Sequence, residues 1–163
     1  MSANMDKIID DIVRQVIGER VAKKTLTNMN LETAKYIISK VEKKAEEMGV
    51  RAVVAVAEAG GNIIAVESMD DAYFASYDIA TNKAYTCVAL KMSTKKLSTL
   101  SLPGQSLYGI QFTNNGRIVI FGGGDPLLSQ GKVIGAVGVS GGSEEQDTAL
   151  SAYAKDIFEQ IIE

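Results

Sequence analysis

The spacing of apolar residues along the chain predicts amphipathic helices at both ends. In residues 1–18 apolar side chains gather on one face and acids and bases on the other, which predicts a helix that Gly18 ends. Residues 19–29 are polar and irregular, and we interpret them as a linker. The pattern therefore separates an N-terminal amphipathic helix from a domain that occupies residues 30–163.

Two helices of this domain carry explicit boundary signals. The segment 31–48 has an inward apolar face, with Asn30 as its expected N-cap and Gly49 at its end. The last helix follows Ser143 and Gln146, whose spacing is that of a capping box. Both helices are thus expected to begin at defined residues.

Between these helices the pattern changes to runs rich in β-branched residues, which predict strands. Two runs lie in residues 51–69 around the glycine-rich turn 58–62, and two more lie in 117–128 and 131–142. A helix over 76–92 separates the two pairs. Adjacent strands joined by tight turns favour an antiparallel sheet with helices packed on it, which is an α+β fold.

A further short helix is expected within residues 93–102, and a long loop follows it over 103–116. Loops of this length in a compact domain are commonly functional. Gln105, Ser106, Tyr108 and Asn114 would supply a pocket in such a loop with polar groups, and a plain connecting loop is the alternative.

Composition narrows the classes of function. The 163 residues have 46% hydrophobic and 23% charged side chains and a net charge of −3, typical of one globular domain and unfavourable for nucleic-acid binding. Charge interrupts every apolar run, so neither a membrane span nor a signal peptide is predicted, and we expect a cytoplasmic protein. The single Cys87 suits a reducing compartment. The absence of histidine excludes histidine triads, imidazole zinc sites and histidine-ligated haem within one chain.

Lys83 is the first candidate for chemistry, because it falls in the middle of the apolar arc of the helix over 76–92. Burying an unpaired ammonium group is costly, so this residue needs a partner unless its amine reaches solvent at the rim. Asp78 is a poor partner, since five residues along a helix place the two side chains about 140° apart. Asp147, in the first turn of the last helix, is the better candidate, and our hypothesis is a contact between Lys83 and Asp147. Simple complementarity to the positive end of the helix dipole is the alternative for Asp147.

Two glycine-rich loops are the second candidate. Gly122, Gly123 and Gly124 follow a predicted strand, and Gly141 and Gly142 lead into the last helix. The free N–H groups of such a helix start can hold an anion, with ordinary turn chemistry as the alternative. No lysine follows these glycines as in a phosphate-binding loop, so nucleotide binding is not expected.

Several long segments of the sequence resemble one known family. They are VVAVAEAGGNIIAVESMDDA, SYDIATNKAYTCVALKM, PGQSLYGIQFTNNGRIVIFGGGDPL and GKVIGAVGVSGGSEEQD. From about residue 25 onward the chain is similar to the GlcG/HbpS family, and most similar to its PduO-like C-terminal domains. The resemblance implies a five-stranded antiparallel sheet flanked by helices, of the profilin-like or roadblock-like kind, and assembly into homo-oligomers.

The resemblance also implies a ligand site. The recurring residues of the family correspond here to Asp78, Lys83, Gly122, Gly123, Gly124, Gly141, Gly142 and Asp147, which would surround one cleft. Family members include haem-binding proteins, and PduO-like members occur with bacterial microcompartments. Haem or cobalamin is therefore the implied cofactor, but without histidine ligation, because this chain has no histidine. No residue is assigned as catalytic or as a metal ligand.

The leading hypothesis is a small-ligand-binding accessory protein that holds a tetrapyrrole or a small anion. One alternative is an enzyme that acts on a small oxygenated metabolite with Lys83 and Asp147, and another is a structural module without a ligand. Residues 1–18 resemble the helices that address enzymes to the lumen of microcompartments, where shell or cargo proteins would be partners. Packing on its own domain or on an oligomer partner is the alternative for this helix.

Overall fold

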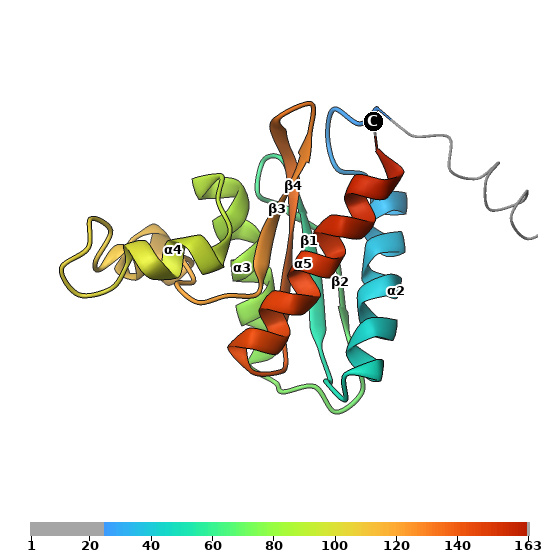
Figure 1. The fold of residues 1–163 in the computed structure, drawn as a ribbon, viewed down its shortest axis with the longest axis horizontal. Helices are drawn as coiled ribbons and strands as arrows, with labels where there is room; N and C mark the ends of the chain where they lie inside the picture. The colour runs from blue at the N-terminus through green and yellow to red at the C-terminus, as the bar shows by residue number, and fades with distance from the viewer. Residues whose placement is uncertain (1–24, 163) are drawn as a thin grey trace, which may run out of the picture.

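The computed structural model describes residues 25–162, so the helix expected over residues 1–18 lies outside the described range. Figure 1 shows the order of the elements along the chain. They are α2 (Leu31–Glu47), β1 (Val53–Glu58), β2 (Ile63–Ser68), α3 (Ser76–Leu90), α4 (Thr94–Leu100), two short 3-10 helices (Ile110–Phe112 and Asn114–Gly116), β3 (Gly124–Ser129), β4 (Lys132–Ser140) and α5 (Glu144–Ile161).

Within residues 25–162 the sheet has four antiparallel strands in the order β2-β1-β4-β3. The α+β class is confirmed, but the expected five-stranded sheet is wrong for this part of the chain. The strand expected over 117–128 is also shorter than predicted, because β3 begins only at Gly124. Upstream of it, the Val119 amide donates to Thr86 Oγ1 of α3 at 3.0 Å. This part of the apolar run therefore bonds to the helix instead of extending the sheet.

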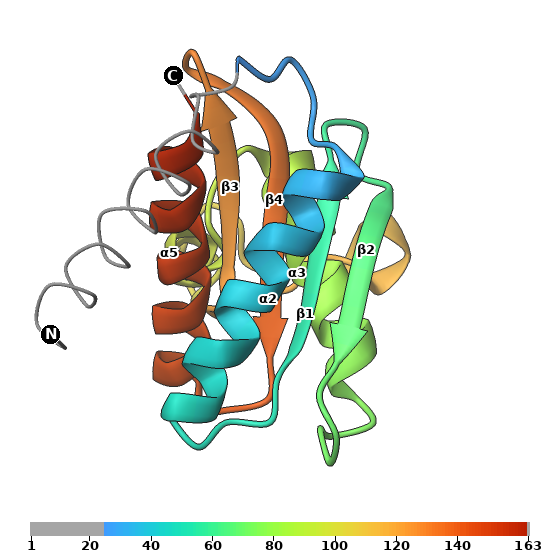
Figure 2. The same cartoon turned by 90° about the vertical axis from the view of Figure 1, so that its right-hand side faces the viewer.

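The sheet lies between two helical layers. Helices α2 and α5 cover one face and α3 covers the other, as Figure 2 shows. Side chains of β1 alternate accordingly, since Val54 and Val56 join the core with α2 and α5, whereas Val53 and Ala55 pack on the side of α3. Among the described residues no helix combines the length and the apolarity that a membrane crossing requires.

Small residues let α3 approach the sheet closely. A Cβ at Gly138 of β4 would overlap the Ala80 carbonyl and come within 2.7 Å of the Ala84 amide and 3.0 Å of the Lys83 Cβ. Only glycine fits at this crossing. The close contact places the base of the Lys83 side chain directly on β4, and this determines where its ammonium group can reach.

The boundary signals read from the sequence are confirmed. The Asn30 side chain accepts from the Thr33 amide at 2.8 Å, and Ser143 and Gln146 form the reciprocal bonds of a capping box at the start of α5. The glycine-rich turn joins β1 to β2 as expected. The end of the segment interpreted as a linker packs on the sheet, because Met29 is buried and its amide donates to the Ile134 carbonyl at 2.9 Å.

Helix α4 and the loop that follows it extend to the side of the three layers (Figure 1). Two short 3-10 helices and a series of turns order this loop. Its apolar side chains Leu102, Tyr108 and Phe112 are exposed. The long loop expected from the sequence is therefore an ordered projection with an apolar surface.

Candidate functional site

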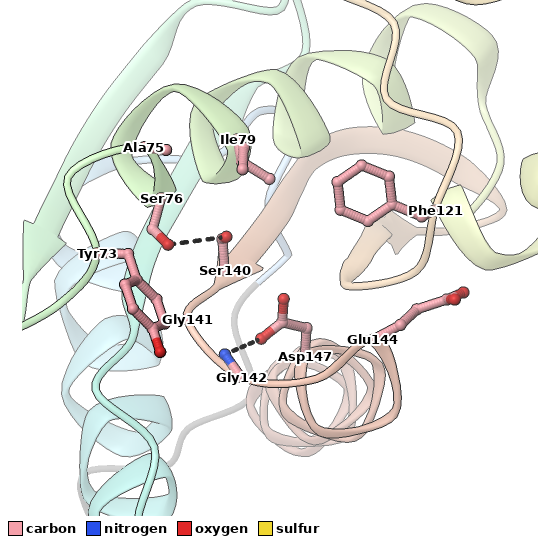
Figure 3. A pocket seen from close by; sticks show the side chains of 10 residues that line it. All are labelled: Tyr73, Ala75, Ser76, Ile79, Phe121, Ser140, Gly141, Gly142, Glu144 and Asp147. Carbon is pink, nitrogen blue, oxygen red and sulfur yellow. Dashed lines mark hydrogen bonds between the residues drawn. The ribbon is translucent and has the colours of Figure 1, made fainter.

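A pocket of about 270 Å³ opens where β4 ends, between the first turns of α3 and α5. Figure 3 shows the residues around it, with α3 on one side and α5 on the other. The lining residues are Tyr73, Ala75, Ser76, Ile79, Phe121, Ser140, Gly141, Gly142, Glu144 and Asp147. They come from three separate segments of the chain, so the pocket exists only in the folded protein.

Lys83 lies behind this pocket and is completely buried. Its Nζ donates to the Val139 carbonyl at 2.8 Å and to Asp147 Oδ2 at 3.0 Å. The same nitrogen lies 4.8 Å from the centroid of the Phe121 ring, which is a cation–π distance. The predicted contact between Lys83 and Asp147 is confirmed. The ammonium group thus contacts a carbonyl oxygen, a carboxylate oxygen and an aromatic ring of the protein.

The burial of Lys83 lowers its pKa below the ordinary value of 10.5, and the Asp147 carboxylate opposes this shift. Asp147 is itself 4% exposed, and its second oxygen, Oδ1, accepts from the Gly142 amide at 2.9 Å. The carboxylate therefore ties the loop before α5 to the buried ammonium group. Because Asp147 lines the pocket and Lys83 does not, the acid is the member of the pair that a bound ligand would meet.

Gly123 allows the pair to form. It has a φ of +112°, and a Cβ there would lie 2.5 Å from Lys83 Nζ and 2.7 Å from the Val139 carbonyl oxygen. Its own carbonyl accepts from the Val139 amide at 2.7 Å. The backbone at this position thus crosses directly over the ion pair, where a larger residue would displace it.

A second ion pair borders the pocket on the solvent side. Lys95 of α4 donates to Glu144 Oε1 at 3.0 Å, and the Gly122 amide donates to the same oxygen at 3.1 Å. Both contacts lower the pKa of Glu144. On the opposite side Ser140 Oγ donates to Ser76 Oγ at 3.1 Å, as the dashed line in Figure 3 marks. The polar part of the lining is thus largely committed to internal bonds.

The start of α5 is similarly occupied. Ser143 Oγ accepts from the Gln146 amide, Gln146 Oε1 accepts from the Ser143 amide, and Asp147 accepts from Gly142. The acids Glu144 and Glu145 lie in the same turn. At this helix end, which the sequence indicated as an anion site, Ser143 thus caps the Gln146 amide, and the acids of the first turn complement the positive end of the dipole.

The structure brings together most of the candidate residues, but not all of them. Gly141, Gly142 and Asp147 line the pocket, while Lys83, Gly123 and Gly124 are buried behind it and Gly122 bonds to Glu144. Asp78 is exposed on α3 and does not line the pocket. The residue pattern did not single out Tyr73, Ser76, Ile79 or Ser140. An exposed aromatic pair in a polar turn, Tyr73 and Phe74, was the available signal for the first of these.

This geometry limits the chemistry of the site. Lys83 is enclosed and ion-paired, so its amine has no open path to a substrate that occupies the pocket. Between residues 25 and 162 no three side chains among cysteines, aspartates and glutamates are grouped as a metal site would require. Ile79 and Phe121 give the pocket apolar walls, and Tyr73 adds an aromatic rim. The arrangement suits the binding of a partly apolar ligand.

Comparison with known proteins identifies the family. Residues 29–155 match the family model described as "Haem degrading protein HbpS-like", so the chain belongs to the HbpS-like family. A 15.0 kDa protein of Citrobacter freundii, from the dhaT-dhaS intergenic region, is 48% identical over 136 residues, which are 83% of this chain and 96% of that protein.

Two solved structures support the same assignment. The crystal structure of Klebsiella pneumoniae protein ORFY has a TM-score of 0.80 and 44% identity, and the match covers 85% of this chain and 95% of ORFY. The crystal structure of a PduOC–haem complex has a TM-score of 0.77 and 34% identity, and the match covers 80% of this chain and 94% of PduOC. The resemblance to PduO-like domains is therefore confirmed.

Proposed function

We propose that this chain is a ligand-binding accessory protein that holds haem at the pocket between α3 and α5. The observation that carries the proposal is the PduOC–haem complex, a haem-bound relative with 34% identity and the same fold. The family description points to haem as well. The pocket supports this ligand through its apolar walls, Ile79 and Phe121, and through its aromatic rim at Tyr73.

The pocket fits one edge of a tetrapyrrole. Its volume of about 270 Å³ lies just below the roughly 300–1,000 Å³ typical of small-molecule sites, so most of a haem would remain outside it. At the mouth, Tyr73 lines the pocket and is 73% exposed. Its ring offers apolar surface for the part of the haem that projects from the pocket.

The residues around the ion pair would hold the shape of this site. Asp147 fixes the Gly141–Gly142 loop through its bond to the Gly142 amide, and Lys83 fixes Asp147 in turn. Phe121 lies over the Lys83 ammonium group and separates it from the pocket. In this proposal Lys83 is a positioning residue, and no step of catalysis is assigned to it.

A titration with haemin tests the proposal, with two matched tryptophan variants. Ala75→Trp places an indole in the pocket from an exposed position, whereas Ala89→Trp adds the same group to an exposed position of α3 that does not line the pocket. We expect saturable Soret changes for wild type and Ala89→Trp, and strongly weakened binding for Ala75→Trp. Equal binding by all three proteins would remove the pocket from the proposal. The same titration with cobalamin tests the corrinoid alternative.

We further propose that the protein is a homo-oligomer and that residues 1–18 address it to a bacterial microcompartment. The exposed Tyr108 and Phe112 on the projecting loop support self-association, and the amphipathic pattern of residues 1–18 supports the address. Light scattering coupled to gel filtration gives the mass of the assembly. Fusion of residues 1–18 to a fluorescent reporter tests the address, because a reporter that stays diffuse in compartment-forming cells contradicts it.

A further inference from the structure

Tyr73 occupies a position in the candidate site that the sequence pattern does not reveal. It lies in the turn between β2 and α3, lines the pocket and is 73% exposed. In Figure 3 its ring stands beside the Gly141–Gly142 loop, across the pocket from Phe121 and Glu144. Its hydroxyl makes no hydrogen bond to any side chain or backbone group of residues 25–162. The phenol is therefore free to bind a group at the mouth of the pocket.

Two other groups that can bind ferric iron, the Cys87 thiol and the Lys83 amine, are enclosed by the protein. Cys87 is completely buried, and burial raises the pKa of its thiol far above the usual range. Lys83 is enclosed by Val139, Asp147 and Phe121. Each of these donor atoms is separated from the pocket by the protein around it.

Tyr85 and the two pocket acids are also committed to other contacts. The Tyr85 ring lies under the Arg117 guanidinium, and its hydroxyl accepts from Asn114. Asp147 uses both oxygens within the protein, and Glu144 is bound by Lys95 and the Gly122 amide. Among the described residues that line the pocket, Tyr73 is the one tyrosine, and tyrosine can bind haem iron as phenolate.

The position of Tyr73 suits contact with a bound iron, because it lines the pocket and its side chain is exposed. The pocket admits one edge of a tetrapyrrole, so the iron at the centre of the ring would lie near the mouth, where the Tyr73 hydroxyl is.

We propose that Tyr73 is the axial iron ligand when this chain holds haem, in place of the histidine that the sequence lacks. The inference rests on the proposed function, since it assumes that haem occupies the pocket. Coordination forms one oxygen–iron(III) bond and releases the hydroxyl proton to solvent. Tyrosinate is an established haem ligand in other proteins, so the chemistry requires no further group.

The test compares ferric haemin complexes of the full wild-type chain, Tyr73→Phe and Tyr77→Phe by electronic absorption and resonance Raman spectroscopy. Tyr77 is the matched control, because it lies in the first turn of α3, is exposed and does not line the pocket. We expect the charge-transfer band and the phenolate vibrations of tyrosinate ligation in wild type and Tyr77→Phe. Tyr73→Phe should lose both signals and bind haemin at least about tenfold more weakly.

The outcomes separate the two proposals. Saturable haemin binding with unchanged phenolate signals in Tyr73→Phe overturns the ligand assignment and leaves the proposed function intact. Loss of the signals in Tyr77→Phe alone also overturns it. If wild type shows no saturable binding, both the proposed function and the assignment of Tyr73 fail.

Discussion

The buried Lys83 ammonium group donates to Asp147 at 3.0 Å across a separation of 64 residues in the chain. The pair joins α3, on one face of the sheet, to α5, on the other, at the end of β4. Both side chains are almost fully enclosed, and each has a second hydrogen bond to the backbone. Lys83 donates to the Val139 carbonyl, and Asp147 accepts from the Gly142 amide. The pair thereby fixes the two helix ends that form the candidate pocket.

Replacement of one partner should be strongly destabilising. Lys83→Met leaves the buried Asp147 carboxylate without its counter-charge, and breaking a buried pair in this way costs about 3–5 kcal/mol. Urea unfolding measures the loss in the free energy of unfolding. The exposed pair between Lys95 and Glu144 provides the control, since Lys95→Met should cost no more than about 1 kcal/mol.

The double variant Lys83→Met/Asp147→Leu removes both charges and should lose less stability than the sum of the single changes. The difference between the sum of the two single losses and the loss of the double variant measures the coupling between the two side chains. Additive losses would mean that the two side chains do not act as a pair.

Gly123→Ala should destabilise the protein more than an ordinary glycine replacement does. Gly131 also has a positive φ, of +76°, but an added Cβ there meets nothing within 4 Å, so Gly131→Ala should cost only the roughly 1–2 kcal/mol of backbone strain. At Gly123 the methyl group would also overlap Lys83 and the Val139 carbonyl. Thermal unfolding of both variants tests the difference, and equal losses would show that the close approach carries no cost.

The sequence predicted the helices of residues 30–163, the hairpin turn and the contact between Lys83 and Asp147. The helices and the turn depend on local patterns, and the contact follows from a single charged residue on an apolar helix face. Asn30 and Ser143 begin helices through bonds to neighbours along the chain. The lysine at the centre of an apolar arc required a buried partner, and the last helix offered one acid at its inward edge.

Features that depend on the assembly of distant segments were predicted poorly. The apolar run before Gly124 predicts a strand, but the Val119 amide in this run donates to Thr86 Oγ1 of α3. The run alone does not predict this contact with a distant helix. Ser76 and Ser140 form a hydrogen bond although 64 residues separate them, and neither local sequence predicts this contact. Tyr73 was missed for the same reason, because a turn residue becomes part of the pocket only through the position of the loop before α5.

Asp125 should make the stability of the protein depend on pH. Desolvation raises the pKa of this carboxyl above its ordinary value of 3.8, although the hydrogen bond from Ser151 Oγ, at 2.7 Å, opposes the shift. Between 3.8 and the folded-state pKa, the folded protein binds more protons than the unfolded chain does. The free energy of unfolding contributed by Asp125 therefore falls as pH rises through this window.

The variant Asp125→Asn has no titrating carboxyl at this position, so its free energy of unfolding does not fall through this window. Relative to wild type it should therefore gain stability as the pH rises from below 3.8 to neutrality. Urea unfolding across this pH range measures the difference. Asp70→Asn, at an exposed position, should follow wild type. A difference between Asp125→Asn and wild type that stays constant with pH would contradict the account of Asp125.

Cys87 should not react with thiol reagents in the native protein. Its side chain is completely buried between α3 and the Gly124 backbone, and burial raises its pKa, so the thiolate is scarce. Ellman's reagent should label it slowly in buffer and rapidly in urea. Fast labelling without denaturant would mean that α3 opens readily from the sheet.

Haem is proposed to enter the pocket between α3 and α5. Paramagnetic ferric haemin broadens the amide signals nearest to its iron, so a titration of the 15N-labelled protein followed by NMR locates the ligand directly. We predict that Ser76, Ser140, Gly141 and Gly142, which line the pocket, lose intensity first. Broadening centred on Tyr108 and Phe112 of the projecting loop, with the pocket signals unchanged, would contradict the claim.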